Sequence, residues 1–264
     1  MPSSAALRQQ IERSFQHRHP SVLTPAPRQI QEVTCTGIAQ IDELLDGGLP
    51  VGAISEITGC ASSGRTTIAL AFLARRTQEG SSCAWIDAND NMDPESAAAN
   101  GVHLKRLLWV RCGNVPIEKS SPVIRRMPSD NKHPWTRLDQ AIRATDLLLQ
   151  AGGFAAIVLD LGDESIEHGR RIPLATWFRF RQTADRTRCS LIVLGKAAYA
   201  QSSSAIVLEC QPDRINIASN AVICGFNFIV GRGHMRFSPL TNIARKPPVS
   251  TWSTQAPWSH DKPA

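Results

Sequence analysis

One glycine-rich stretch indicates phosphate chemistry: Gly59-Cys60-Ala61-Ser62-Ser63-Gly64-Arg65-Thr66-Thr67. Its spacing is that of a phosphate-binding loop (Gly, four residues, Gly, Lys, Ser or Thr), except that Arg65 takes the lysine position. In such loops backbone N–H groups turn toward the phosphates, the lysine reaches the terminal phosphates, and the hydroxyl ligates magnesium. A guanidinium is longer, planar and rigid, so it does not simply replace an ammonium in a tight cradle. The pattern therefore predicts a nucleotide-handling fold with impaired catalysis.

A phosphate loop must be positioned by a strand before it and a helix after it. Residues 52–58 read as a short strand, and apolar side chains at 68, 70, 72 and 73 predict a mostly buried helix from Thr66 to Gln78. These flanks favour a phosphate loop over an unrelated Gly/Ser turn. The predicted nucleotide contacts within it are Gly59, Ser62, Ser63, Gly64, Arg65, Thr66 and Thr67.

The rest of the chain alternates between predicted strands and helices. Strands are expected at 83–87, 107–110, 154–160 and 190–195, with a helix at 138–150 and a surface loop at 113–134. This alternation predicts a parallel sheet with right-handed crossovers. Three late segments without intervening helices, 205–209, 214–218 and 224–230, predict an antiparallel extension. The expected fold class is α/β, with a mostly parallel central sheet flanked by helices.

Composition divides the chain into three parts: a helical arm and linker (1–33), a core (34–243) and a disordered tail (244–264). The arm repeats apolar residues at 7, 11 and 15, and a helix this short must pack on its own domain or on a neighbouring subunit. The tail is rich in Pro and Ser and carries Trp252 and Trp258. We expect the two tryptophans to dock on a partner, although two harmless tail residues are the alternative.

Composition also argues against several classes of protein. The chain has 264 residues, 42% of them hydrophobic, and a net charge of +6, which permits nucleic-acid contact without requiring it. None of the seven cysteines has zinc-knuckle or redox spacing, so we expect reduced thiols. With no signal peptide and no apolar run of membrane-spanning length, a cytoplasmic location away from the membrane is expected.

The residues around the loop resemble a known family. Thr36-Gly37, Ile41-Asp42 and Gly47-Gly48-Leu49-Pro50 precede it, and Cys83-Ala84-Trp85-Ile86-Asp87-Ala88 follows. Together they resemble the core of bacterial RecA recombinases, closely over 36–112 and more loosely over 113–240. No resemblance is found outside 34–240. The resemblance implies a RecA-like P-loop domain that binds ATP or ADP with Mg, the metal being held by Thr66 and Asp160.

The departures from this family concern hydrolysis. Asn89 stands where the family has its water-activating glutamate, and an amide cannot act as a base. Lys196 falls near the position of the phosphate-sensing glutamine. Ser219 and Ala221 fall where two lysines would complete a neighbouring subunit's site. Both loops that bind DNA in the family are short here.

This pattern is similar to RecA-like accessory proteins of the ImuA type. The resemblance implies a scaffold in SOS-induced DNA repair and error-prone translesion synthesis, with a Y-family polymerase-like partner. Single-stranded DNA, a RecA filament, or self-association through the arm are further expected contacts. The alternatives are a divergent DNA-dependent ATPase and a RecA-like cell-division inhibitor. A small-molecule kinase lacks support, because no acceptor motif is present.

A basic stretch follows Asp160, with six arginines interleaved with Trp177, Phe178 and Phe180. It predicts contact with DNA phosphates or with an acidic protein partner. The alternative is a solvated helix face whose aromatic residues pack on the sheet and whose arginines pair with Asp185 and Glu167. The six are Arg170, Arg171, Arg179, Arg181, Arg186 and Arg188.

Overall fold

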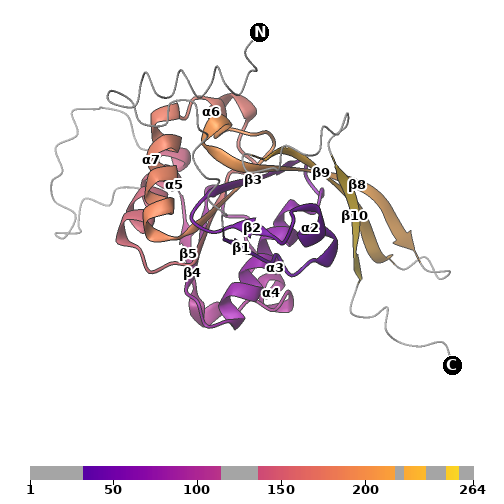
Figure 1. Ribbon diagram of the computed structural model, residues 1–264. Coiled ribbons are helices and arrows are strands. Elements are labelled where there is room, and N and C mark those ends of the chain that lie inside the picture. Colours follow the sequence, from indigo (N-terminus) through magenta and orange to yellow (C-terminus); the bar gives the residue numbers. More distant parts are fainter. Residues whose placement is uncertain (1–31, 114–135, 218–222, 236–247, 256–264) are drawn as a thin grey trace, which may run out of the picture. The chain divides into compact units, whose positions relative to one another are not determined.

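The computed structural model describes residues 32–113, 136–217, 223–235 and 248–255. An eight-stranded sheet runs through these residues, drawn from indigo to yellow in Figure 1. In spatial order its strands are β10 (Val249–Gln255), β9 (Ile223–Met235), β8 (Ser204–Ile217), β3 (Ile54–Gly59), β7 (Ser190–Gly195), β6 (Ala156–Asp160), β4 (Cys83–Asp87) and β5 (Leu107–Arg111). A separate two-stranded ribbon pairs β1 (Val33–Thr34) with β2 (Leu49–Pro50).

Six neighbouring strands, from β8 to β5, are parallel. The parallel strands β3, β4, β6 and β7 are almost wholly buried, as expected of strands covered by helices on both faces. Their continuous apolar runs are the signal that the sequence carries. The predicted strands and the mostly parallel α/β fold are therefore confirmed.

The antiparallel extension is also present, with two differences from the prediction. Segments 205–209 and 214–218 form one long strand, β8, whose register with β9 shifts between Pro212 and Ile215. A proline is tolerated at such an irregularity because it has no N–H to donate to the ladder.

The second difference corrects the predicted disordered tail. Residues 249–255 form β10, which pairs with β9 in antiparallel register, Trp252 lying opposite Phe228. Side chains along β10 alternate between exposed and more buried positions, with Trp252 buried. This period of two, in a segment with valine and two threonines, is typical of a strand. The polar composition of the segment led to the prediction of a disordered tail.

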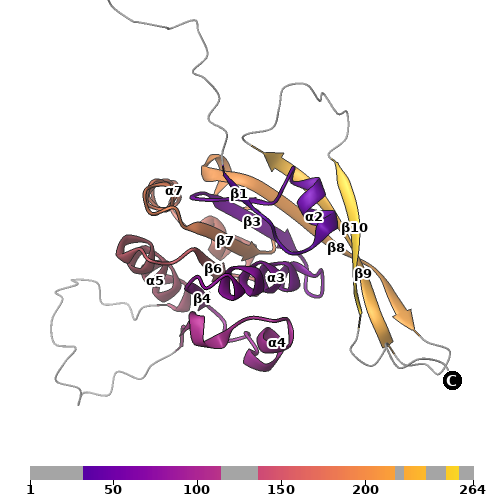
Figure 2. The same ribbon diagram turned by 60° about the horizontal axis from the view of Figure 1, so that its bottom comes forward.

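Helices cover both faces of the sheet (Figures 1 and 2). One apolar cluster joins α2 and α3 to strands β3, β4 and β8, and the other joins α5 and α7 to the opposite face. Figure 2 shows α3 and α4 on one side of β4 and β6, with α5 and α7 beyond the strands. The helices are α2 (Ala39–Leu44), α3 (Arg65–Gln78), α4 (Pro94–Ala99), α5 (Arg137–Ala151), α6 (Ile166–Arg170) and α7 (Leu174–Thr187), with 3₁₀ turns η1 (Leu104–Arg106) and η3 (Gln201–Ser203).

Local signals fix the ends of the longer helices. A capping box between Thr136 and Asp139 starts α5, and Gly152 with φ 70° ends it. The predicted basic helix is in fact two helices, because Pro173 precedes α7 and separates it from α6. A proline interrupts a helix by removing a donor and restricting the residue before it.

Several predictions fall outside the described residues: the arm over 1–31, most of the loop at 113–134, Ser219 with Ala221, and Trp258. The chain divides into two compact units, residues 1–32 and residues 33–264, and the predicted boundaries at 33/34 and 243/244 stay predictions. Within the described part of the chain, no helix is long and apolar enough to cross a membrane.

Candidate nucleotide site

The phosphate loop lies between the strand and the helix that the sequence predicts. β3 ends at Gly59 and α3 begins at Arg65, with Gly64 in the left-handed conformation at φ 84°. A side chain at Gly59 would lie 2.4 Å from Ser63 Oγ, so the loop folds tightly over the end of β3. The cap of α3 receives no side-chain hydrogen bond. Among the described residues, the N–H groups of Gly64, Arg65 and Thr66 donate no hydrogen bond, so these groups remain free for an anion.

The Arg65 side chain turns inward and is only 9% exposed. Its guanidinium donates one hydrogen bond to the Gly59 carbonyl, another to Gly162 O at 2.9 Å, and a long one to Gly195 O at 3.5 Å. These carbonyls lie at or just beyond the carboxyl ends of β3, β6 and β7. A buried cation must be compensated, and here backbone carbonyls supply that compensation.

Asp163 bonds to residues of the other loops that surround Arg65. Its carboxylate lies 4.0 Å from the Arg65 guanidinium and accepts a hydrogen bond from the Asn91 amide. Its carbonyl accepts a hydrogen bond from Lys196 Nζ at 3.1 Å. The loops that follow β3, β4, β6 and β7 are therefore connected through one acidic residue, which no sequence motif marks.

Asp160 ends β6 beside this cluster. Its Oδ1 accepts a hydrogen bond from Gly162 N at 2.8 Å. Burial raises the pKa of the Asp160 carboxyl to about 6, and the nearby Asp87 charge raises it further, while the Gly162 N–H and the Arg65 cation oppose the shift. A carboxyl of this kind ligates a cation only after losing its proton.

Asn89, which stands where the RecA family has its water-activating glutamate, lies just after β4. The buried Asp87 carboxylate accepts hydrogen bonds from Asn89 N at 3.2 Å and Met92 N at 2.8 Å. Asp87 therefore shapes the turn that carries Asn89. The Asn89 side chain makes no hydrogen bond with other described residues.

The connection after β7 is short, as predicted, and a buried glutamate fixes it. Glu56 Oε1 accepts hydrogen bonds from Tyr199 N at 2.5 Å and Ala200 N at 2.9 Å, just before η3. Burial raises the pKa of the Glu56 carboxyl. Sequence reasoning missed this contact because 143 residues separate the donor from the acceptor.

Two aromatic side chains cover the start of α3. Trp252 stacks on Phe228 with ring centroids 4.6 Å apart, and a Cβ added to Gly64 would lie 2.7 Å from the tryptophan ring. Trp252 is 5% exposed. The prediction that Trp252 docks on a partner is therefore wrong, since its ring is already packed against its own phosphate loop.

The candidate magnesium ligands are less constrained. Thr66 is exposed, and its hydroxyl makes no hydrogen bond with the described residues. Described His, Cys, Asp and Glu side chains form no group of three that would hold a metal by themselves. Thr66 and Asp160 would thus need phosphate oxygens and water to complete magnesium coordination.

The six arginines do not share one environment. Arg179 pairs with Asp146 of α5 at 3.0 Å, and Trp177 with Phe180 packs inward in an edge-to-face pair, so the predicted aromatic packing is observed for those two rings. Within the described residues, the predicted ion pairs of these arginines with Asp185 and Glu167 do not form. Helical spacing places Arg181 on the opposite flank of α7 from Arg179. The six therefore do not form a single stripe.

Comparisons with known proteins agree with this geometry. Residues 3–116 match the RecA N-terminal domain, so the match begins within the arm, where the sequence analysis found no resemblance. The chain is 43% identical over 99 residues to Protein RecA of a Nostoc species, covering 38% of this chain and 28% of that protein. It is 30% identical over 194 residues to Protein RecA of a Synechocystis species, covering 71% of this chain and 50% of that protein.

A solved structure has a similar fold. The fold matches that of the RadB recombinase with a TM-score of 0.54 and 18% identity, covering 83% of this chain and 94% of that one. The chain spans about half or less of the length of the curated RecA proteins named above. The phosphate loop and the sequence matches together support a RecA-like core for this chain, and its fold resembles that of RadB.

Proposed function

We propose that this protein is a RecA-like accessory scaffold in SOS-induced DNA repair and error-prone translesion synthesis, without useful nucleotide hydrolysis. The observation that carries the proposal is the placement of Arg65, whose buried guanidinium is bonded to carbonyls at the ends of the central strands. A cation held in this way is not free to follow charge developing on a transferred phosphoryl group. Catalysis of that transfer depends mainly on such electrostatic stabilisation.

The other substitutions support the same conclusion. Asn89 supplies no base, and Lys196 donates to the Asp163 carbonyl in place of a sensing amide. What remains is the part of the site that binds phosphate: free N–H groups at the start of α3, the Thr66 hydroxyl and Asp160. ATP or ADP with Mg would be held weakly by these groups, and the metal would supply charge neutralisation when bound.

An ATPase assay on the full chain, with and without single-stranded DNA, tests the proposal. We expect no DNA-stimulated turnover above the rate of the Thr66→Ala variant. A rate near ~0.1 per second, lost in Thr66→Ala, would instead favour the divergent ATPase. Restoring the usual residues with Arg65→Lys and Asn89→Glu together provides the reference for a repaired site.

Residual binding needs a separate measurement, with labelled ADP and magnesium. We expect micromolar to millimolar affinity, weakened by Thr66→Ala. This variant is preferable to Gly64→Asp, because a side chain at Gly64 would collide with Trp252 and alter packing as well as binding. If Thr66→Ala leaves the affinity unchanged, the loop is not the site.

The partner in this proposal is a Y-family polymerase-like mutagenesis protein, with single-stranded DNA or a RecA filament as further contacts. Co-expression and co-purification with such a polymerase-like protein tests it directly. A gene neighbourhood that encodes a mutagenesis cassette would support the scaffold, whereas a cell-division locus would favour the inhibitor alternative.

A further inference from the structure

Helix α7 carries apolar side chains on two sides. Its inner side is buried through Trp177 and Phe180. On its outer side Leu174 is 53% exposed and Phe178 is 51% exposed. These two residues are four positions apart, so their side chains are neighbours on the helix surface. Single exposed apolar residues are ordinary, but an adjacent leucine and phenylalanine on one helix face form a patch.

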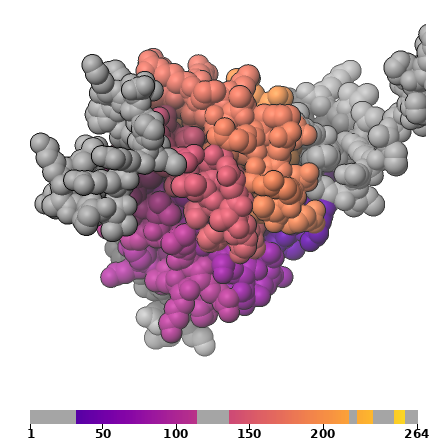
Figure 3. Space-filling view, turned by 90° about the vertical axis from the view of Figure 1, so that its left-hand side faces the viewer, coloured from indigo at the N-terminus to yellow at the C-terminus, as the bar shows by residue number. Residues whose placement is uncertain are grey.

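Cations surround this patch. Arg181 lies one turn beyond Phe178, and Arg171 immediately precedes the Ile172–Pro173 entry to α7. The side chains of these two arginines, and those of Arg170 and Arg186, form no ion pair or hydrogen bond in the described part of the chain. Arg179, by contrast, is bonded to Asp146 of α5. In Figure 3 this helix lies beside α5 on the face turned toward the viewer, in the salmon-to-orange colours of its residues.

We propose that the outer face of α7, defined by Leu174, Phe178, Arg171, Arg181 and Arg186, docks an acidic amphipathic helix of a partner protein. Two apolar anchors of that helix would cover Leu174 and Phe178. Carboxylates beside the anchors would pair with the free guanidinium groups, whose planar donors suit bidentate contact. Docking of a helix through spaced apolar anchors is a common recognition mode.

Charge and shape favour this occupant over others. The residues before the core are basic, with arginines at 8, 13, 18 and 28 against glutamates at 12 and 32, so like charge disfavours the chain's own arm as the occupant. Single-stranded nucleic acid binds on successive aromatic rings, yet Trp177 and Phe180 are buried and only Phe178 is available.

The test uses the full chain and a displayed library of random helical peptides. Selection is carried out against the unmodified chain, with counter-selection against a Leu174→Ser, Phe178→Ser variant. We expect enriched peptides to carry net negative charge and apolar residues three or four positions apart. In fluorescence anisotropy titrations, Phe178→Ser should weaken the best peptide at least tenfold, and Arg181→Gln with Arg186→Gln should weaken it several-fold.

A matched control is Leu147→Ser, because Leu147 is also 51% exposed but lies on α5. This variant should bind the peptide as the unmodified chain does. Melting temperatures check folding, and Phe178→Gln repeats the test should the serine variant be less stable. The proposal does not depend on the polymerase-like partner, since the peptide is selected without it.

Several outcomes would overturn the proposal. One is a set of enriched peptides without acidic bias, and another is equal binding of those peptides to the Leu174→Ser, Phe178→Ser variant. A thirty-nucleotide dT strand whose binding alone is lost with Phe178→Ser would make this a nucleic-acid surface. A change in sedimentation with Phe178→Ser would identify a second copy of the chain as the occupant. Tighter peptide binding after deletion of residues 1–31 would identify the chain's own arm.

Discussion

The carboxyl edge of the sheet and the outer face of α7 use their polar groups in opposite ways. At the edge, Arg65 donates to backbone carbonyls and Glu56 accepts two backbone N–H groups. On α7, Arg181 and Arg186 have no described partner, and Phe178 is half exposed. At the edge, the charged side chains are already bonded within the protein. On the helix face, the charged side chains are available to bind a ligand.

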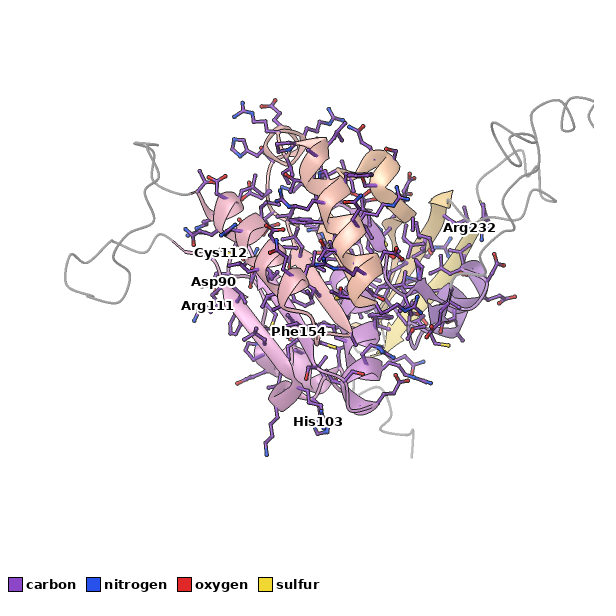
Figure 4. The ribbon with its side chains drawn as sticks, turned by 60° about the vertical axis from the view of Figure 1, so that its left-hand side comes forward. Asp90, His103, Arg111, Cys112, Phe154 and Arg232 are labelled. Atoms are coloured by element: carbon purple, nitrogen blue, oxygen red, sulfur yellow. The ribbon has the colours of Figure 1, made fainter. Side chains whose placement is uncertain are left out.

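A third location shows that ion pairs alone do not mark either kind of region. Arg111 pairs with Asp90 through two contacts of 2.6 Å at the end of β5, and Figure 4 shows the two residues side by side. Both side chains are well exposed there. Exposed pairs of this kind contribute little to stability. The contrast between edge and helix face therefore depends on burial as well as on pairing.

The largest expected effect concerns the aromatic cover of the edge. Trp252→Ala should lower the free energy of unfolding by about 3–5 kcal/mol, because it removes a buried ring and leaves a cavity against Phe228. Chemical denaturation measures this change. The neighbouring Thr251→Ala, at an exposed position of the same strand, is the control. A near-zero cost for Trp252→Ala would mean that β10 does not hold the loop.

Arg65→Met should have the next largest effect on stability. It removes the donor from the Gly59 and Gly162 carbonyls while keeping much of the side-chain volume, at an expected cost of about 2–4 kcal/mol. Arg75→Met in the same helix is the matched control, since Arg75 is exposed and paired only with Glu79. Equal costs for the two variants would show that Arg65 is not part of a closed site.

A pH dependence should follow from Asp160. The folded pKa, about 6, lies above the unfolded value of about 4, so the folded state retains the proton longer. Stability contributed by this group is therefore lost as the pH rises from about 4 to about 6. Asp160→Asn should remove that loss. The free energy of unfolding of the variant, relative to the unmodified chain, should therefore be about 2 kcal/mol higher at pH 7 than at pH 4.

Denaturation of both proteins at the two pH values isolates this contribution, because other acidic groups are common to them. The amide oxygen can still accept the Gly162 N–H, so the turn after β6 should persist. A difference that grows as the pH falls would contradict the assigned direction of the shift.

The smallest stability effect is expected on α7. Arg181→Gln with Arg186→Gln should change the free energy of unfolding by no more than about 0.5 kcal/mol per substitution, since neither residue has a described partner. Arg179→Gln should cost more, because it leaves the buried Asp146 carboxylate without its closest cation. Thermal melts compare the double variant with Arg179→Gln. A large loss for the double variant would assign Arg181 and Arg186 to folding.

The sequence by itself determined the fold class and the position of the loop. Buried parallel strands produce continuous apolar runs, and the glycine spacing marks the strand–loop–helix unit, so both signals are local. The substitutions Arg65 and Asn89 were also visible, because they stand within a recognised pattern.

Only the tertiary structure decided how those residues are used. The Arg65 carbonyl partners at Gly162 and Gly195 are 97 and 130 residues away, and no local pattern specifies such contacts. The packing of Trp252 likewise depends on a strand partner, Phe228, outside its own segment. Composition reports how polar a segment is, whereas burial depends on which distant segment covers it, and for that reason a Ser- and Thr-rich stretch could be mistaken for a free tail.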